Sequence, residues 1–221
     1  LERSLQWKSH FIFFSSSEIY GNPSPEYIPT PESYKGYVSC LGPRACYDES
    51  KRMGETLCYV FANYYDLHTN IIRPFNVYGP GMSQLDYRMI PNLMKCAVNK
   101  SVLSIYGDGN QTRTFCYLTD AVEGFLRVLA NGEPGAVYNI GNDSPEVSML
   151  KLIDIFNSST NSIVEHNLIA YPDFYPADEP LRRCPDLSLA KTILGYSPNT
   201  ALNLGLKNTF AWASKNYQLT K

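Results

Sequence analysis

Tyr47 and Lys51 are the residues of this sequence whose types and spacing most directly indicate chemistry. On a helix, side chains four residues apart project from the same face. A cation held beside a phenol stabilises the phenolate, so the phenol can exchange a proton with a substrate hydroxyl while a hydride moves elsewhere. Such pairs also arise by chance on exposed helix faces, so the motifs on either side decide the interpretation.

Size and charge exclude several classes of protein. With 221 residues, 44% of them apolar, the chain has the composition of a soluble globular protein of one or two domains. A net charge of −2 without a basic cluster argues against nucleic acid as a partner. No apolar run reaches the ~20 residues of a membrane span, and the first residues do not form a signal peptide. We expect a cytoplasmic protein, and an anchor or signal ahead of residue 1 is left open.

The six cysteines and three histidines are scattered along the chain, and no Cys-x-x-Cys occurs. This distribution favours small buried thiols in a reducing compartment over a disulfide framework. It also predicts that the chain has no metal site.

Hydrophobic patterning predicts strands that alternate with helices, which indicates an α/β fold. The continuous apolar run at 10–15 predicts a strand buried on both faces of a parallel sheet. A long loop rich in Pro, Gly, Ser and Tyr is expected at 21–43 and another loop at 170–185. The remaining predicted elements are helices at 44–66, 87–99, 120–130, 148–157, 186–194 and 203–216, and extended segments at 70–75, 102–106, 113–118 and 137–140.

A dinucleotide-binding fold opens with a strand and a glycine-rich turn, whose backbone amides bind the pyrophosphate at a helix N-terminus. The first residues of this chain contain no such turn, and its later glycines do not form one after a strand. We therefore expect the chain to begin in mid-fold, without the first strands of the sheet.

Five motifs follow one another in register along the sequence. They are Ser15-Ser-Ser-Glu-Ile-Tyr-Gly21, Gly42-Pro-Arg-Ala-Cys-Tyr-Asp-Glu-Ser-Lys-Arg52, Arg73-Pro-Phe-Asn-Val-Tyr-Gly-Pro80, Tyr106-Gly-Asp-Gly-Asn-Gln-Thr-Arg113 and Asp178-Glu-Pro-Leu-Arg-Arg-Cys-Pro-Asp186. Together they resemble the extended short-chain dehydrogenase/reductase family of nucleotide-sugar enzymes, and most of all its UDP-glucuronate decarboxylases. Each motif is modest by itself, but five in order make the resemblance specific.

The resemblance implies a Rossmann-type parallel sheet, here without its N-terminal strands, and a smaller C-terminal substrate-binding domain. Residues 1–80 and 114–145 would belong to the NAD-binding domain, and residues 81–113 and 146–221 to the nucleotide-sugar-binding domain. The family also forms dimers through the helix that carries Tyr47. The apolar face of that helix suits either core packing or such a homodimer, and the sequence does not separate the two.

The resemblance assigns catalytic roles to the first two motifs. Tyr47 and Lys51 would act with Ser16, which in the family binds the sugar hydroxyl that is oxidised, whereas a lone serine run is more often a polar strand end. The next two positions distinguish chemistries, because relatives that dehydrate a sugar carry Asp-Glu there and decarboxylases carry Ser-Glu. Ser17 and Glu18 therefore indicate decarboxylation, with Glu18 positioning the sugar ring.

Binding roles follow for the strand end at 74–76. In the family, the asparagine that Asn76 matches contacts the diphosphate, and residues at Pro74 and Phe75 lie near the nicotinamide, as do Tyr47 and Lys51. Asn76 lies where parallel strands place their ligands. Its alternative interpretation is a turn-forming asparagine before Gly-Pro.

Forked guanidinium groups suit a diphosphate, and relatives bind it from the two segments that contain Arg113 and the Arg182–Arg183 pair. The sequence does not decide between Arg182 and Arg183. Arg88 and Tyr106 are further candidates for the same pocket. As isolated residues, the arginines would be read as surface charges.

The function that these residues imply is NAD-dependent decarboxylation of UDP-glucuronate to UDP-xylose through a 4-keto intermediate. A 4-epimerase or a 4,6-dehydratase of another nucleotide sugar is the alternative within the family. A non-catalytic nucleotide-sugar-binding fragment is the alternative outside it. Because the glycine-rich turn is absent, we expect this chain by itself to be inactive.

Overall fold

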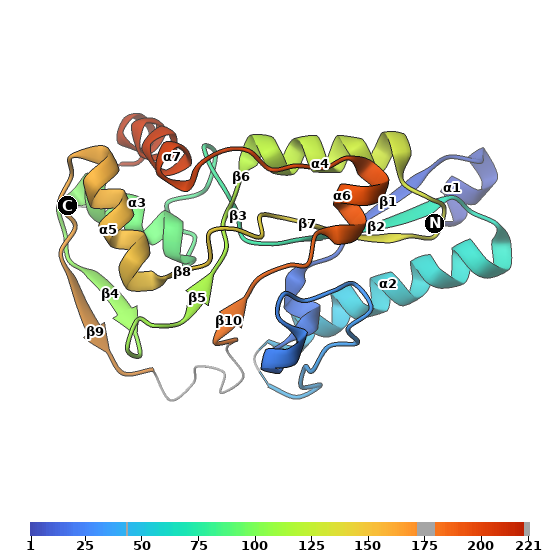
Figure 1. The fold of residues 1–221 in the computed structure, drawn as a ribbon. Helices are drawn as coiled ribbons and strands as arrows, with labels where there is room; N and C mark the ends of the chain where they lie inside the picture. Colours follow the sequence, from blue (N-terminus) through green and yellow to red (C-terminus); the bar gives the residue numbers. More distant parts are fainter. Residues whose placement is uncertain (43, 172–179, 219–221) are drawn as a thin grey trace.

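The computed structural model describes residues 1–42, 44–171 and 180–218 (Figure 1). Three parallel strands form its main sheet in the order β1 (Phe11–Phe14), β2 (Thr69–Pro74) and β7 (Val137–Ile140). The predicted α/β fold with a parallel sheet is therefore confirmed.

Helices cover both faces of this sheet. Helix α2 (Ala45–Tyr65) packs on one face, and α4 (Leu118–Asn131) and α6 (Ser188–Leu194) lie on the other (Figure 1). Burial of apolar side chains between these layers forms one core of the molecule. Its fully buried members are Ile72, Val128, Tyr138, Ile140, Leu187, Ala190, Leu194 and Tyr196.

A second core lies at the other end of the molecule (Figure 1). There β4 (Leu103–Tyr106) pairs in parallel with β9 (His166–Ile169), beside the three helices α3 (Met89–Asn99), α5 (Met149–Thr160) and α7 (Leu202–Asn216). The predicted boundaries of the two domains stay a prediction. Helix α6, which that division assigns to the second domain, packs against α4 and β7 of the main sheet.

Short strands lie between the two cores. Strand β5 (Thr112–Arg113) pairs with both β8 (Val147–Ser148) and β10 (Arg182–Arg183), so two of the predicted arginine segments lie side by side. The remaining elements are β3 (Val77–Tyr78), β6 (Cys116–Tyr117), helix α1 (Glu2–Trp7) and the 3-10 helices η1 (Ser17–Tyr20) and η2 (Pro25–Tyr27).

Helix α2 runs over 21 residues because its sequence contains no proline and places apolar side chains toward the sheet. Gly54 in its middle is explained by the ring of Phe13, since a Cβ there would lie 2.2 Å from that ring. The helix ends at Asp66, whose left-handed backbone closes the last turn.

Some expectations from the sequence were wrong. Strand β1 is only partly buried, with Phe14 46% exposed, because within the described residues it is the edge strand and has β2 as its one neighbour. Cys40 and Cys46 are exposed, so not all six thiols are buried. The extended segment at 113–118 is instead divided between β5, β6 and the start of α4.

Several elements had not been predicted, among them α1 and β9. Strand β9 is short and three of its four residues are exposed, so it lacks the apolar pattern by which a strand is recognised. The middle of the predicted loop at 170–185 and the first two residues of its motif, Asp178 and Glu179, lie outside the described residues. None of the helices described is both long and apolar enough to span a bilayer.

Candidate active site

The Tyr47–Lys51 pair lies in the first two turns of α2, beside the carboxyl end of β1. The Nζ atom of Lys51 is 5.7 Å from the centroid of the Tyr47 ring, so the two side chains share one face as predicted. The same Nζ donates a hydrogen bond of 2.9 Å to the carbonyl of Phe14 and lies 5.5 Å from the Phe13 ring. These contacts fix the ammonium group against the strand, and the Tyr47 ring remains about half exposed.

The serine motif begins one residue after Phe14. Ser16 precedes the single turn of η1, and its Oγ accepts a hydrogen bond of 3.2 Å from the Glu18 backbone N–H. This contact satisfies a free N–H at the start of the helical turn. Both Ser16 and Ser17 are buried. The predicted catalytic hydroxyls therefore stand at the strand end that Lys51 contacts.

Glu18, from the first sequence motif, contacts an arginine of the second motif and an arginine of the fifth. Its carboxylate forms a two-pronged ion pair with Arg183, in which Nη2 and Oε2 are 2.9 Å apart, and it also contacts Arg44. Arg44 in turn lies 3.9 Å from Asp48, one helical turn further on. Burial raises the pKa of Asp48, and the two guanidinium groups beside it oppose that rise. The cluster thus combines two carboxylates and two arginines at the start of α2.

A cavity of about 870 Å³ opens beside this cluster and extends along the second core. Six of the predicted site residues line it, although they come from segments far apart in the sequence. They are Glu18, Asn76, Arg88, Tyr106, Arg113 and Arg183. The volume falls within the range of small-molecule sites.

The arginines of this cavity are held by neighbouring groups. Arg113 is buried and donates from Nη1 to the carbonyl of Thr112 at 2.8 Å. Arg88 forms a bidentate pair with Asp86, and its hydrogen bonds hold the pKa of that carboxyl below its usual range. Arg182 points to a different partner, a bidentate pair with Glu146, and it is not among the lining residues described.

Asn76 has the backbone of a turn residue and a side chain that faces the cavity. Its backbone is left-handed, with φ +41°, as expected of a turn-forming asparagine. Its side chain lines the cavity and donates from Nδ2 to the carbonyl of Thr114 at 2.8 Å. Pro74 and Phe75 precede it at the end of β2, where Phe75 is buried against Tyr20.

Several site residues were missed from the sequence. Arg44 and Asp48 could have been found from their spacing, since charges at i and i+4 meet on a helix. Tyr171 stacks on Tyr106 with ring centroids 5.7 Å apart and lines the cavity, but no local pattern in the sequence indicates it. In the described parts of the chain, no group of three or more His, Cys, Asp or Glu side chains is arranged to hold a metal ion.

The main sheet is parallel, a Tyr–Lys pair lies at its strand ends, and an arginine-lined cavity lies beyond them. These features define the class of Rossmann-type nucleotide-binding proteins. Within that class, the model of the NAD dependent epimerase/dehydratase family matches residues 2–141, and the chain belongs to this family.

Two similar curated proteins are decarboxylases. UDP-glucuronic acid decarboxylase 3 of Arabidopsis thaliana is 36% identical over 198 residues, which make up 90% of this chain and 56% of that protein. UDP-glucuronic acid decarboxylase 1 of Xenopus tropicalis is 35% identical over 210 residues, or 95% of this chain and 48% of that protein. The chain thus spans about half the length of these relatives.

Among solved structures, UDP-glucuronic acid 4-epimerase from Bacillus cereus, in complex with UDP-glucuronic acid and NAD, has a similar fold. Its TM-score is 0.79 with 29% sequence identity, and the match covers 94% of this chain and 62% of that one.

Proposed function

We propose that the whole protein removes CO₂ from UDP-glucuronate to give UDP-xylose, with NAD as a tightly held cofactor. The observation that carries the proposal is the arrangement of Lys51 between Tyr47 and the end of β1, beside a turn that reads Ser16-Ser17-Glu18. The names of the curated relatives agree with this reaction.

The strand ends fit the nicotinamide half of NAD. The buried Oγ of Ser15 has no hydrogen-bond partner among the described residues, so it can receive a polar group of a ligand there. Pro74 and Phe75 are apolar and lie at the end of the neighbouring strand. When bound, NAD⁺ accepts hydride from C4 of the sugar and later returns it.

The phenolic oxygen of Tyr47 would take the proton of the C4 hydroxyl, while the Lys51 ammonium stabilises the phenolate and Ser16 binds the same hydroxyl. Once C4 is a ketone, the sugar carboxylate lies β to a carbonyl, so CO₂ can leave and the electrons move to O4. Glu18 would hold the ring. After CO₂ has left, C5 of the enolate would take up a proton from water, which replaces the lost carboxylate. Return of the hydride to C4 and of the Tyr47 proton to O4 then restores the alcohol, and the return of the hydride makes the cycle redox-neutral.

The diphosphate would lie between Arg113 and Arg183, since both are buried and line the cavity. Charge-assisted hydrogen bonds from forked guanidinium groups suit such an anion. Asn76, Arg88 and Tyr106 would complete this part of the site.

A product assay tests the proposal. The whole protein, incubated with UDP-glucuronate and NAD, should release CO₂ and form a UDP-pentose. With UDP-glucose or dTDP-glucose it should form no 4-keto-6-deoxy sugar, because Ser17 offers no carboxylic acid for loss of water. Detection of the deoxy product would mean that another group supplies this acid.

A 4-epimerase is the second candidate, because the Bacillus cereus neighbour is named for epimerisation of the same sugar nucleotide. It would convert UDP-glucuronate to an isomer of equal mass that retains its carboxylate. Binding of UDP-glucuronate without any turnover would instead support the non-catalytic alternative.

The same proposal includes a homodimer through α2. Leu57 and Tyr64 are exposed on this helix, at 45% and 76%, and Phe61 is partly buried beside them. Light scattering should show a dimer that Leu57→Glu converts to a monomer, because a carboxylate buried in the interface would be unpaired. A wild-type monomer at all concentrations would contradict this part.

A further inference from the structure

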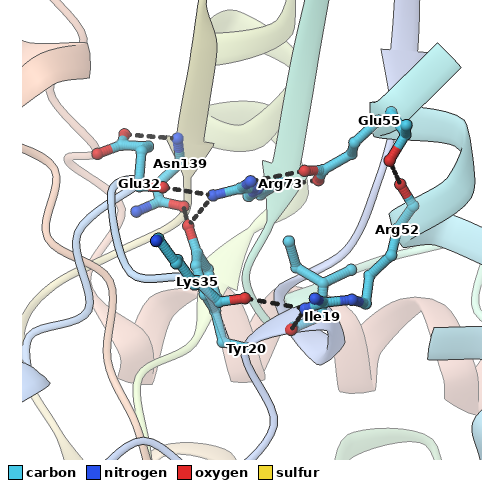
Figure 2. Close-up of polar contacts among 9 residues, drawn as sticks. Ile19, Tyr20, Glu32, Lys35, Arg52, Glu55, Arg73 and Asn139 are labelled. Carbon is cyan, nitrogen blue, oxygen red and sulfur yellow. Dashed lines mark hydrogen bonds and ion pairs between the residues drawn. The ribbon is translucent and has the colours of Figure 1, made fainter. Parts of the chain in front are cut away.

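Arg73, in the middle of the main sheet, is a buried arginine that the mechanism above does not use. Its guanidinium makes four hydrogen bonds (Figure 2). Nε and Nη2 donate to the two carboxylate oxygens of Glu55 on α2, at 2.9 and 2.6 Å. Nη1 donates to the Tyr20 hydroxyl at 2.7 Å and to the Glu32 carbonyl at 2.8 Å.

The Tyr20 hydroxyl extends this network. Burial raises the pKa of Tyr20, so the hydroxyl keeps its proton and donates it to Asn139 Oδ1 at 2.8 Å. Asn139 in turn donates from Nδ2 to the carbonyls of Thr30 and Asp186, at 3.0 and 3.1 Å. One continuous set of hydrogen bonds thus joins α2, β2, η1, β7 and the segment that follows β10.

Each of these connections ends close to a residue of the candidate active site. Tyr20 is the last residue of the turn that holds Ser17 and Glu18. Glu55 lies one helical turn after Lys51, and Asp186 lies three residues after Arg183. Arg73 itself does not line the cavity within the described part of the chain, so it acts through its neighbours.

A second arginine reinforces the connection between α2 and η1. Arg52, next to Lys51, donates from Nη1 to the carbonyls of Ile19 and Lys35, at 3.3 and 2.9 Å (Figure 2). The turn is therefore held at its backbone by Arg52 and at its last side chain by Arg73.

Stability alone is a weak explanation for this network. Desolvation of both charges of a buried ion pair offsets most of their attraction, and well-packed apolar residues in their place often leave a protein as stable. Directional hydrogen bonds do what apolar residues cannot, because they fix the position of one segment relative to another.

We propose that Arg73 is a positioning residue: through Tyr20 and Glu55 it holds the Ser16–Glu18 turn in register with the Tyr47–Lys51 helix. This inference rests on the proposed function. The Ser16 hydroxyl, the Tyr47 phenol and the Lys51 ammonium must act together at the C4 hydroxyl of the sugar. A shift of about 1 Å in one such group can lower turnover about 10²-fold.

The test compares the whole protein with the paired variant Arg73→Met/Glu55→Leu and with Tyr20→Phe. In both variants the dissociation constant for UDP should stay within about 2-fold of the wild-type value, while turnover of UDP-glucuronate should fall. For the paired variant we expect turnover to fall about 10- to 100-fold. The turnover of Arg73→Lys should lie between that of the wild type and that of the paired variant, because the single ammonium of lysine cannot bind Glu55 and Tyr20 together. The control pair Arg127→Met/Glu123→Leu removes an exposed ion pair on α4 and should have wild-type turnover.

Amide hydrogen exchange gives a readout that does not depend on the reaction. Protection of the Glu18 and Gly21 amides, which bond to Ser16 Oγ and to the Glu18 carbonyl, should fall at least about 10-fold in both variants. Wild-type turnover or wild-type protection in Tyr20→Phe overturns the inference, even if the paired variant does not fold. If the wild-type protein itself releases no CO₂, the proposed function fails, and the exchange result still decides the positioning role.

Discussion

The ammonium of Lys51 hydrogen-bonds the carbonyl of Phe14 at 2.9 Å, so the second turn of α2 is tied to the last residue of β1. Tyr47 lies one turn earlier, with its ring centroid 5.7 Å from the same nitrogen. The position of the phenol is thus set by the edge of the sheet as well as by its helix. A cofactor bound along that edge and a sugar above it would both be within reach of this side chain.

The first prediction is that Tyr47→Phe lowers turnover of UDP-glucuronate by at least about 10²-fold, the usual effect of losing a general acid–base group. The dissociation constant for UDP should change little, because Tyr47 is not among the described residues that line the cavity. Steady-state kinetics and calorimetry in the whole protein measure the two quantities.

Tyr59→Phe is the matched control, since Tyr59 is an exposed tyrosine on the same helix. It should leave turnover unchanged. Near-normal turnover in Tyr47→Phe would remove Tyr47 from the mechanism, whatever the control shows.

The second prediction separates the neighbouring arginines. Arg113→Ala and Arg183→Ala should each weaken UDP binding by roughly 10- to 100-fold, since a charge-assisted hydrogen bond contributes about 1.5–3 kcal/mol. Arg182→Ala should have little effect, because its guanidinium pairs with Glu146 at the surface. Calorimetric titration with UDP measures all three.

Thermal unfolding is the necessary check on these variants, since Arg113 and Arg183 are buried and their removal can also lower stability. If folded Arg113→Ala and Arg183→Ala proteins bind UDP as the wild type does, the two arginines are structural. If Arg182→Ala alone weakens binding, the diphosphate lies on the other side of β10.

Local sequence patterns predicted most of the elements. The segment at 70–75, which contains Ile71, Ile72 and Phe75, and the long amphipathic pattern at 44–66 correspond closely to β2 and α2, because burial and periodicity act over neighbouring residues. The exposure of Phe14 was not predictable in this way, since it depends on which other segments cover the strand.

The candidate site was predicted in part. The Tyr47–Lys51 pair follows from helical spacing alone, and the structure brings Lys51 to Phe14, two residues before Ser16. The ion pair between Glu18 and Arg183 joins residues 165 positions apart, which no local pattern encodes. Which of the two arginines lines the cavity likewise depends on the alternation of β10, where the Arg182 side chain is exposed and that of Arg183 is buried.

The third prediction concerns the thiols. Burial raises the pKa of Cys58 to about 11 and that of Cys116 and Cys184 to about 12, so these groups stay protonated and unreactive. The exposed thiols of Cys40 and Cys46 should therefore be alkylated first by iodoacetamide.

Mass spectrometry of the labelled peptides over time measures the rates, and the protein unfolded in urea, where all thiols should react alike, is the control. Labelling of Cys116 in the folded protein as fast as that of Cys46 would contradict the packing around Tyr196 and Cys116.

The fourth prediction concerns Glu32, whose carboxylate accepts a hydrogen bond of 2.8 Å from the Asn139 backbone N–H. Burial raises the pKa of Glu32 above its ordinary value of 4.5; the Asn139 hydrogen bond and Arg73 oppose this rise and the charge of Asp186 adds to it. The folded state therefore holds this proton more tightly than the unfolded state. The free energy of unfolding falls as the pH rises from 4.5 through the raised pKa, and the penalty is fully present above it.

Glu32→Gln keeps an oxygen that can accept the Asn139 hydrogen bond but carries no charge. The variant should be more stable than the wild type at neutral pH, and the difference should vanish as the pH falls toward 4.5. Urea unfolding at a series of pH values measures this, with Glu26→Gln as the control, because Glu26 is exposed and its pKa is lowered by a backbone hydrogen bond. A stability difference between Glu32→Gln and the wild type that is the same at every pH would show that the pKa of Glu32 is not raised by folding. A loss of stability that grows as the pH rises would show that the native site needs the ionised carboxylate.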